Sequence, residues 1–187
     1  MDEEHRIILG IIKGDSRAFS LLVDRYQKLV FHVAKKVLPE QADAEDVAQE
    51  VFIKIHKSIG TFKFQSKLST WIASITYFTA INHQKKNKRD FTEGYTEDSL
   101  QMDDGQENPE ELMEKKSAAQ YLRQLTDQLP EKYRIVLTLF HLEEFSIEEI
   151  GETTGIPEGT IKNYLFRARR MLKDKITNHI NRDYDER

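Results

Sequence analysis

Cationic, amide and aromatic side chains near the carboxyl end of the chain have the chemistry that binds DNA. The set is Thr160, Lys162, Asn163, Phe166, Arg167, Arg169, Arg170 and Lys173. Arg and Asn hydrogen-bond base edges in the major groove, Phe contacts the thymine methyl group, and Lys and Arg neutralise phosphates. Apolar residues alternate with this set at steps of four, three and four positions, and they are Ile161, Leu165, Ala168 and Leu172. This spacing predicts a helix that buries the apolar stripe and presents the DNA-binding set on its other face.

The residues before that helix predict the element that would hold it in the groove. Ser146 followed by Glu149 is a capping-box pattern, which predicts a short helix over 146–154. Gly155 begins a turn, and the longer helix is expected over about 158–178. A short helix, a glycine-containing turn and a longer helix form a helix-turn-helix.

Residues near the start of the second helix of such a motif come closest to the bases. We therefore expect base contacts from Lys162, Asn163, Phe166 and Arg167. Phosphate contacts are expected from Arg169, Arg170 and Lys173. A solvated basic face is the alternative interpretation.

A second set of aromatic and basic side chains interleaves near the middle of the chain. Its members are Phe62, Lys63, Phe64, Gln65, Ser66, Lys67, Trp71, Tyr77, Phe78, Lys85, Lys86, Lys88 and Arg89. Aromatic faces stack unpaired bases and cations follow the strand, so this composition indicates binding of single-stranded nucleic acid. We expect an irregular stretch over 61–67 and a helix over about 69–87, capped by Ser69 or Thr70. Trp71 also fits a core position.

The third candidate surface is a polar face on a helix expected over 43–59, which Gly60 is expected to end. The buried side of this helix would carry Val47, Val51 and Ile55. Its opposite side presents Asp46, Gln49, Glu50 and, unless it is a core residue, Phe52. An acidic face with no catalytic partner suits docking onto a basic protein surface, and a plain solvated face is the alternative.

An acidic segment separates two groups of predicted helices. A helix capped by Asp15 is expected over 16–38, and further helices over 109–129 and 131–142. Residues 90–114 contain ten acidic and no basic side chains, which leaves the rest of this chain of net charge −4 at +6. Such a segment predicts a flexible linker. The predicted fold class is therefore all-α, with two small helical domains at 1–90 and 116–187 joined by an acidic flexible linker at 91–115.

Several function classes are excluded by what the sequence lacks. There is no cysteine, which rules out disulfides, thiolate catalysis and cysteine-ligated zinc. The six histidines show no metal-binding spacing, and no phosphate-binding glycine loop or nucleophile motif is present. We therefore expect neither an enzyme nor a cofactor. Without a secretory signal or a long apolar run, a soluble, cytoplasmic protein with no membrane insertion is expected.

Stretches in both halves of the chain carry a resemblance to a known family. In the first half they are Asp43–His56, Thr61–Phe62, Ser69–Ala73 and Lys85–Arg89. These resemble region 2 of the bacterial extracytoplasmic-function (ECF) sigma factors, and Leu129–Arg134 with the helix-turn-helix resembles region 4. The resemblance covers about residues 5–178. It implies binding to promoter DNA and to core RNA polymerase, through the coiled coil of its largest subunit and its flap region, under control of an anti-sigma factor.

The resemblance also implies a role for each candidate surface. It assigns Asp46, Gln49, Glu50 and Phe52 to the polymerase coiled coil. It assigns the interleaved aromatic and basic set to the −10 element, with the loop Lys63–Leu68 capturing an extruded base, and the helix-turn-helix to the −35 element. The chain departs from the family at Phe78, where Asn is common, and at Asn82, where Asp is frequent. A standard −10 sequence is therefore not expected.

Two alternatives remain open. The linker is interpreted either as a solvated spacer or as a segment that threads a basic channel of the polymerase. The whole chain could instead be a stand-alone helix-turn-helix DNA-binding transcriptional regulator. That interpretation explains residues 146–173 but not the constellation in the first half.

Overall fold

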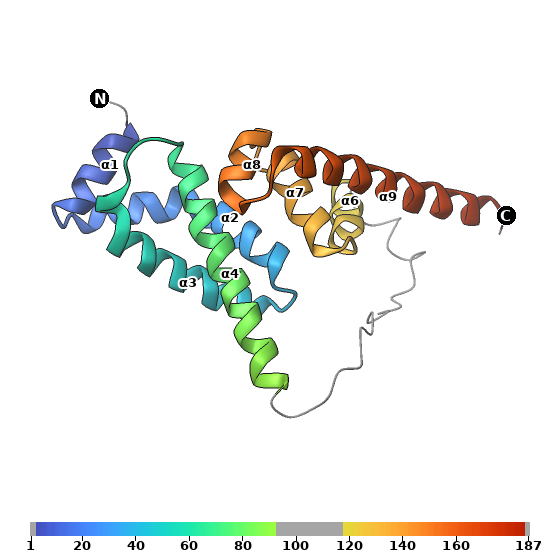
Figure 1. Ribbon diagram of the computed structural model, residues 1–187, viewed down its shortest axis with the longest axis horizontal. Helices are drawn as coiled ribbons and strands as arrows, with labels where there is room; N and C mark the ends of the chain where they lie inside the picture. Colours follow the sequence, from blue (N-terminus) through green and yellow to red (C-terminus); the bar gives the residue numbers. More distant parts are fainter. Residues whose placement is uncertain (1–2, 93–117, 186–187) are drawn as a thin grey trace.

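The computed structural model describes residues 3–92 and 118–185, and every regular element in these ranges is a helix. The all-α prediction is confirmed. The N-terminal half contains α1 (Glu3–Ile12), α2 (Ser16–Val37), α3 (Gln41–Ser58), the 3-10 turn η1 (Ile59–Thr61) and α4 (Leu68–Thr92). The C-terminal half contains α6 (Ala118–Asp127), α7 (Glu131–His141), α8 (Ile147–Thr154) and α9 (Glu158–Asp185) (Figure 1). Most of the predicted linker, and the helix start expected at Pro109, lie outside the described residues.

Helices α2, α3 and α4 form the core of the N-terminal half. Val47, Val51 and Ile55 are completely buried on α3, as the predicted stripe requires. They belong to one apolar cluster with Leu22 of α2 and Ile72 of α4, which are also fully buried. Because one side of α3 is buried in this cluster, its other side is left free for solvent or a partner.

Helix α1, which the sequence pattern did not indicate, packs across the start of α2. It buries Ile7, Ile8 and Ile11. Gly10 permits the close approach, because a Cβ atom at this position would lie 2.7 Å from the Cβ atom of Ala18. The packing places α1 beside η1, at the start of the loop that leads to α4.

The structure confirms one helix start and corrects three other boundaries. Asp15 caps α2 as predicted, accepting a hydrogen bond from the backbone N–H of Arg17 at 2.9 Å. Gly60 lies inside η1 without the positive φ of a glycine cap. Thr70 is buried within α4, which begins at Leu68, so neither predicted cap is used. Helix α9 runs seven residues past its predicted end, since residues 179–185 contain neither glycine nor proline.

The helix-turn-helix forms as predicted. Ser146 accepts a hydrogen bond from the Glu149 backbone N–H at 3.1 Å, and the Glu149 carboxylate accepts one from the Ser146 N–H at 2.8 Å. Gly155 ends α8 with φ at 73°, a left-handed conformation that suits glycine. The predicted stripe of α9 is buried, and it comprises Ile161, Leu165, Ala168 and Leu172. The opposite face of α9 is therefore free to meet DNA.

The two halves contact each other, which the sequence did not predict. Helix α8 packs on α4 and α7 packs on α2 (Figure 1). His32 Nδ1 lies 2.8 Å from Glu143 Oε1, and Gln84 donates a hydrogen bond of 2.8 Å to Glu131. Further ties are an ion pair of Lys36 with Asp127 and a bond of 2.9 Å from Arg134 to the Lys36 carbonyl. We call this placement the closed arrangement.

Candidate nucleic-acid interface

The exposed face of α9 carries most of the predicted DNA-binding set. Phe166 is 66% exposed, although its ring is large and apolar. The other exposed members are Lys162, Asn163, Arg167, Arg169, Arg170 and Lys173, while Thr160 is half-buried. Lys162 is held only by a surface ion pair of 3.4 Å with Glu158. An apolar ring among exposed cations matches the chemistry of a major-groove contact.

Arg169 differs from its neighbours because its head group lies against the protein. Its Nη2 atom is 3.3 Å from His141 Nε2, and its guanidinium lies 5.5 Å from the centre of the Phe140 ring. Burial lowers the pKa of His141, and the positive charge of Arg169 lowers it further. A neutral imidazole can accept a hydrogen bond from the guanidinium. In this conformation the Arg169 head group contacts His141 and Phe140, and its phosphate contact stays a prediction.

The loop between η1 and α4 presents Phe64 and conceals Phe62. Phe62 is only 9% exposed, and its ring centre lies 5.4 Å from that of Trp71 and 4.8 Å from that of Phe64. The ring of Phe62 supports the loop from inside, and its contact with DNA stays a prediction. Phe64 is 45% exposed, with its backbone at φ 57°. The other members of the loop are exposed Lys63, Gln65 and Lys67 and half-buried Ser66.

Helix α4 continues this surface. Trp71 is half-buried against Phe62, in agreement with the core alternative. Phe78 is 47% exposed and meets the half-buried Tyr77 edge-on, with 5.3 Å between ring centres. Burial raises the pKa of Tyr77, and the negative charge of Glu131 raises it further. Exposed Lys85 and Lys86 follow, and Lys88 and Arg89 lie on the same helix.

The polar face of α3 is exposed, and an apolar hollow adjoins it. Asp46, Gln49 and Glu50 are exposed, and Glu50 pairs with Lys54 at 2.8 Å. A hollow of about 200 Å³ is lined by Phe19, Phe52, Ile53, His56 and Lys57. Phe52 packs against the core, as its alternative interpretation requires, and also lines the hollow, while its contact with the polymerase stays a prediction. Sequence reasoning missed Ile53, whose 55% exposure makes it an apolar addition to the acidic face.

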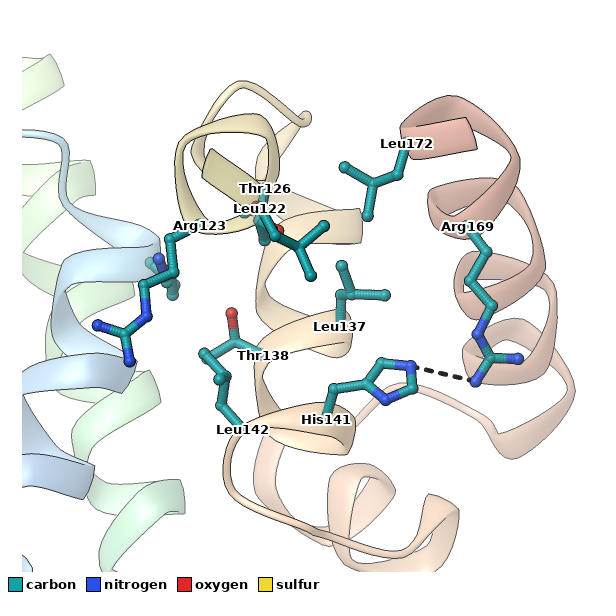
Figure 2. A pocket seen from close by; sticks show the side chains of 10 residues that line it. Leu122, Arg123, Thr126, Leu137, Thr138, His141, Leu142, Arg169 and Leu172 are labelled. Atoms are coloured by element: carbon teal, nitrogen blue, oxygen red, sulfur yellow. Dashed lines mark hydrogen bonds between the residues drawn. The ribbon is translucent and has the colours of Figure 1, made fainter. Parts of the chain in front are cut away.

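Sequence reasoning also missed a pocket of about 380 Å³ that lies mainly between α6, α7 and α9, with Lys36 of α2 in its lining (Figure 2). Leu122, Leu137, Leu142 and Leu172 make its wall apolar, and Figure 2 shows the paired His141 and Arg169 at its side. The hydroxyl of Thr138 is buried without a hydrogen-bond partner among the described residues. The 48% exposure of Leu122 and 46% exposure of Leu142 mark the pocket as an apolar site open to a partner.

The described geometry defines a helical protein of two halves with a helix-turn-helix in the second. Residues 22–90 match the family model of sigma-70 region 2, and residues 119–172 match that of sigma-70, region 4. The chain is 34% identical over 177 residues to the ECF RNA polymerase sigma factor SigW of Bacillus subtilis, covering 90% of this chain and 94% of that protein. It is also 34% identical over 177 residues to the ECF RNA polymerase sigma-E factor of Escherichia coli K12, covering 91% of this chain and 92% of that protein.

The chain therefore belongs to the ECF sigma factors of the sigma-70 family, which bind core RNA polymerase and direct promoter-specific transcription initiation. Two solved structures share its fold. The sigma factor RpoE of Bartonella quintana, in complex with the anti-sigma factor NepR, aligns with a TM-score of 0.66 at 20% identity, over 85% of this chain and 96% of that chain. CnrH, in complex with the cytosolic domain of CnrY, aligns with a TM-score of 0.64 at 18% identity, over 95% of this chain and 99% of that chain.

No helix in the described ranges has the length and apolar character needed to cross a membrane. Within the same ranges, the acidic and histidine side chains form no cluster of three that could hold a metal ion.

Proposed function

We propose that three surfaces of this sigma factor divide the work of initiation. Helix α9 reads the −35 element, the loop 62–67 with α4 opens and reads the −10 element, and α3 with the leucine-lined pocket holds core RNA polymerase. The observation that carries this proposal is the exposed face of α9, where Phe166 stands among cations while the stripe behind it is buried. On the outer helix of a helix-turn-helix, an exposed ring among cations suits contact with a thymine methyl group beside phosphates.

At the −35 element, we assign base contacts to Lys162, Asn163, Phe166 and Arg167. These residues lie in the first three turns of α9, the part of a recognition helix that enters the groove. Arg170 and Lys173 lie further along the helix and are assigned to phosphates. In this conformation Arg169 steadies the packing of α9 on α7.

At the −10 element, we assign base capture to Phe64 and strand tracking to the cations around it. Phe64 combines an exposed aromatic face with a fixed backbone, which is what a stacking platform needs. Phe62 and Trp71 support it from inside. Phe78 provides a second exposed ring on α4. Its bulk differs from the Asn common in the family, so it is assigned to a −10 preference of this chain's own.

We assign two surfaces to the polymerase. The acidic face of α3, with Ile53 beside it, fits the coiled coil of the largest subunit, because it joins carboxylates to an apolar hollow. The pocket of the C-terminal half fits an amphipathic helix of the flap region, because leucines line it and cationic groups lie at its side. Core polymerase acts in the cytoplasm, which is where we place this chain.

The closed arrangement cannot serve both promoter elements at once. The −10 and −35 elements lie about 25 base pairs apart, which is roughly 85 Å at 3.4 Å per pair. In the closed arrangement, α8 of the helix-turn-helix packs directly on α4. The halves must therefore separate on the promoter. The connecting residues 93–117 permit this, because a 25-residue chain can span about 85 Å at most.

We infer that an anti-sigma factor controls the chain by holding the closed arrangement. The support is that RpoE of Bartonella quintana, which shares the fold, was solved with such a partner. The ion pairs between the halves are partly exposed, so a protein that clamped both halves would shift the equilibrium toward the closed arrangement. If the chain stays fully active when coexpressed with every neighbouring-gene product, this inference fails.

In vitro transcription tests the proposed function. The purified chain is added to core bacterial polymerase on fragmented genomic DNA, and the 5′ ends of the transcripts are sequenced. We expect discrete chain-dependent start sites that share a two-part upstream element. Phe64→Ala should abolish them, whereas Arg25→Ala on the exposed side of α2 should not. Sequence-specific duplex binding without polymerase, and no new start sites, would favour the stand-alone regulator instead.

A further inference from the structure

Two rings from distant parts of the chain stack face to face at the loop 62–67. The imidazole of His5 on α1 lies 3.9 Å from the Phe64 ring, centre to centre, and the two planes differ by only 10°. The other ring contacts of Phe62 and Phe64 are tilted by 50° and 58°, as is usual in packed cores. A flat heterocycle parallel to a phenyl ring at this distance has the geometry of a base stacked on an aromatic side chain.

The loop holds Phe64 in a conformation that its own preferences disfavour. Its φ of 57° lies in the left-handed region, which non-glycine residues adopt rarely and at a cost in free energy. The ring nevertheless stays 45% exposed, with Phe62 tilted against it. Backbone strain persists where the surroundings fix it, so the loop is built to present this ring rather than to bury it.

One of the two cations of the same loop, Lys67, is also paired with a group of the protein. Lys67 Nζ lies 2.9 Å from Glu149 Oε1, which belongs to α8 in the other half. An unpaired nucleotide would offer the loop a flat base and a negative phosphate. In this structure α1 supplies a flat imidazole to Phe64, and α8 of the other half supplies a negative carboxylate to Lys67.

We propose that His5 is a placeholder for a DNA base, which occupies the stacking face of Phe64 until a base extruded from the promoter displaces it. This rests on the proposed role of the loop in base capture. The His5 ring keeps Phe64 ordered in the free chain and competes with every incoming base. A base that stacks weakly cannot displace it, so His5 sets a threshold that makes capture selective.

Binding of single-stranded DNA tests the proposal. The probe is a randomised single strand of about 12 nucleotides that carries the fluorescent base 2-aminopurine, whose emission falls when it stacks. In the full chain, His5→Ala should bind the probe about 3- to 10-fold more tightly, because the competing stack is removed. It should also quench the probe more deeply. His5→Gln, which removes the ring but keeps a polar side chain, should behave in the same way.

Two controls fix the interpretation. His5→Phe keeps a ring on Phe64 and should bind no more tightly than the original chain. Leu9→Ala alters another exposed side chain of α1 and should change nothing. Alanine and glutamine are good helix formers, so α1 is expected to remain folded, and thermal melting checks this.

The outcomes separate this proposal from the function on which it rests. If Phe64→Ala weakens binding but both His5→Ala and His5→Gln bind as the original chain does, or less tightly, the placeholder is refuted and base capture by the loop stands. If Phe64→Ala leaves binding and quenching unchanged, base capture by Phe64 fails and the placeholder fails with it.

Discussion

The Lys67 ammonium lies 2.9 Å from the Glu149 carboxylate, which ties the loop 62–67 of the N-terminal half to the helix-turn-helix. Glu149 is also the residue that closes the capping box of α8 through Ser146. Thr70 of α4 donates a longer hydrogen bond of 3.5 Å to the same carboxylate oxygen. One side chain thus stabilises the start of α8 and occupies a cation of the loop. If the loop binds the −10 strand as proposed, competition between Glu149 and a phosphate would couple DNA binding to separation of the halves.

Replacing Glu149 by Gln should loosen the closed arrangement without unfolding α8, because Gln also closes a capping box. The lost ion pair is partly exposed at Lys67, so the expected effect is below about 1 kcal/mol. The chain has no native cysteine, so Lys28→Cys and Asp174→Cys provide sites for a fluorescent label pair, one on each half. Energy transfer between the labels should fall in the variant. Glu148→Gln, one residue away on α8, is the matched control and should leave the transfer unchanged.

Acid should open the closed arrangement through the same residue. Burial alone would raise the pKa of Glu149, but hydrogen bonds from Ser146 and the nearby Lys67 outweigh it and hold the pKa below its usual 4.5. A carboxyl whose folded-state pKa is depressed stabilises the structure above its unfolded pKa and loses that contribution as the pH falls through the lower value. Energy transfer should therefore fall only when the pH drops below the usual range of a glutamate carboxyl. If Glu149→Gln shows the same acid transition, another carboxyl is responsible.

Arg167→Ala should weaken recognition of the −35 element by about 1–3 kcal/mol, the usual value of a lost base contact. Arg167 is exposed on α9, so polymerase binding and thermal stability should not change. Competition binding of the holoenzyme to matched and mismatched −35 sequences measures the effect. An equal loss on every DNA sequence would reassign Arg167 to a phosphate. Arg170→Ala is the comparison, since its expected loss is uniform and smaller at high salt.

The sequence predicts the structural features that depend on local periodicity. The stripe from Ile161 to Leu172 and the cap at Ser146 are set by residues three and four positions apart, and both were predicted. The concealment of Phe62 and the exposure of Phe64 depend on a loop with a left-handed residue, which no helical period describes. The contact of Lys67 with Glu149 joins residues 82 positions apart, so only the folded arrangement reveals it.

Asp46→Ala combined with Gln49→Ala should weaken binding to core polymerase and leave the fold intact, because both side chains are exposed and the stripe behind them is not touched. Ile53→Ala should add to the loss. The side chain of Ile53 is 55% exposed in the free chain, so it stabilises the complex only when the polymerase covers it. Fluorescence anisotropy of the labelled chain against core polymerase measures both. Glu45→Ala, an exposed acidic neighbour, is the control. Unchanged binding in the double variant would show that the docking face lies elsewhere.

Two adjacent threonines of α8 should respond in opposite ways to replacement by valine. The Thr153 hydroxyl is buried without a hydrogen-bond partner among the described residues, so Thr153→Val removes a desolvated polar group at nearly constant volume. We expect the free energy of unfolding to rise by up to about 1–2 kcal/mol. The Thr154 hydroxyl donates to the Ile150 carbonyl at 2.7 Å and accepts from the Ile156 N–H at 3.2 Å. Thr154→Val removes both bonds and leaves the Ile156 N–H without this acceptor, so it should lower the free energy of unfolding by about 1–3 kcal/mol. Urea unfolding of the two variants side by side measures the difference, and equal destabilisation would mean that the Thr153 hydroxyl has a partner after all, such as a bound water.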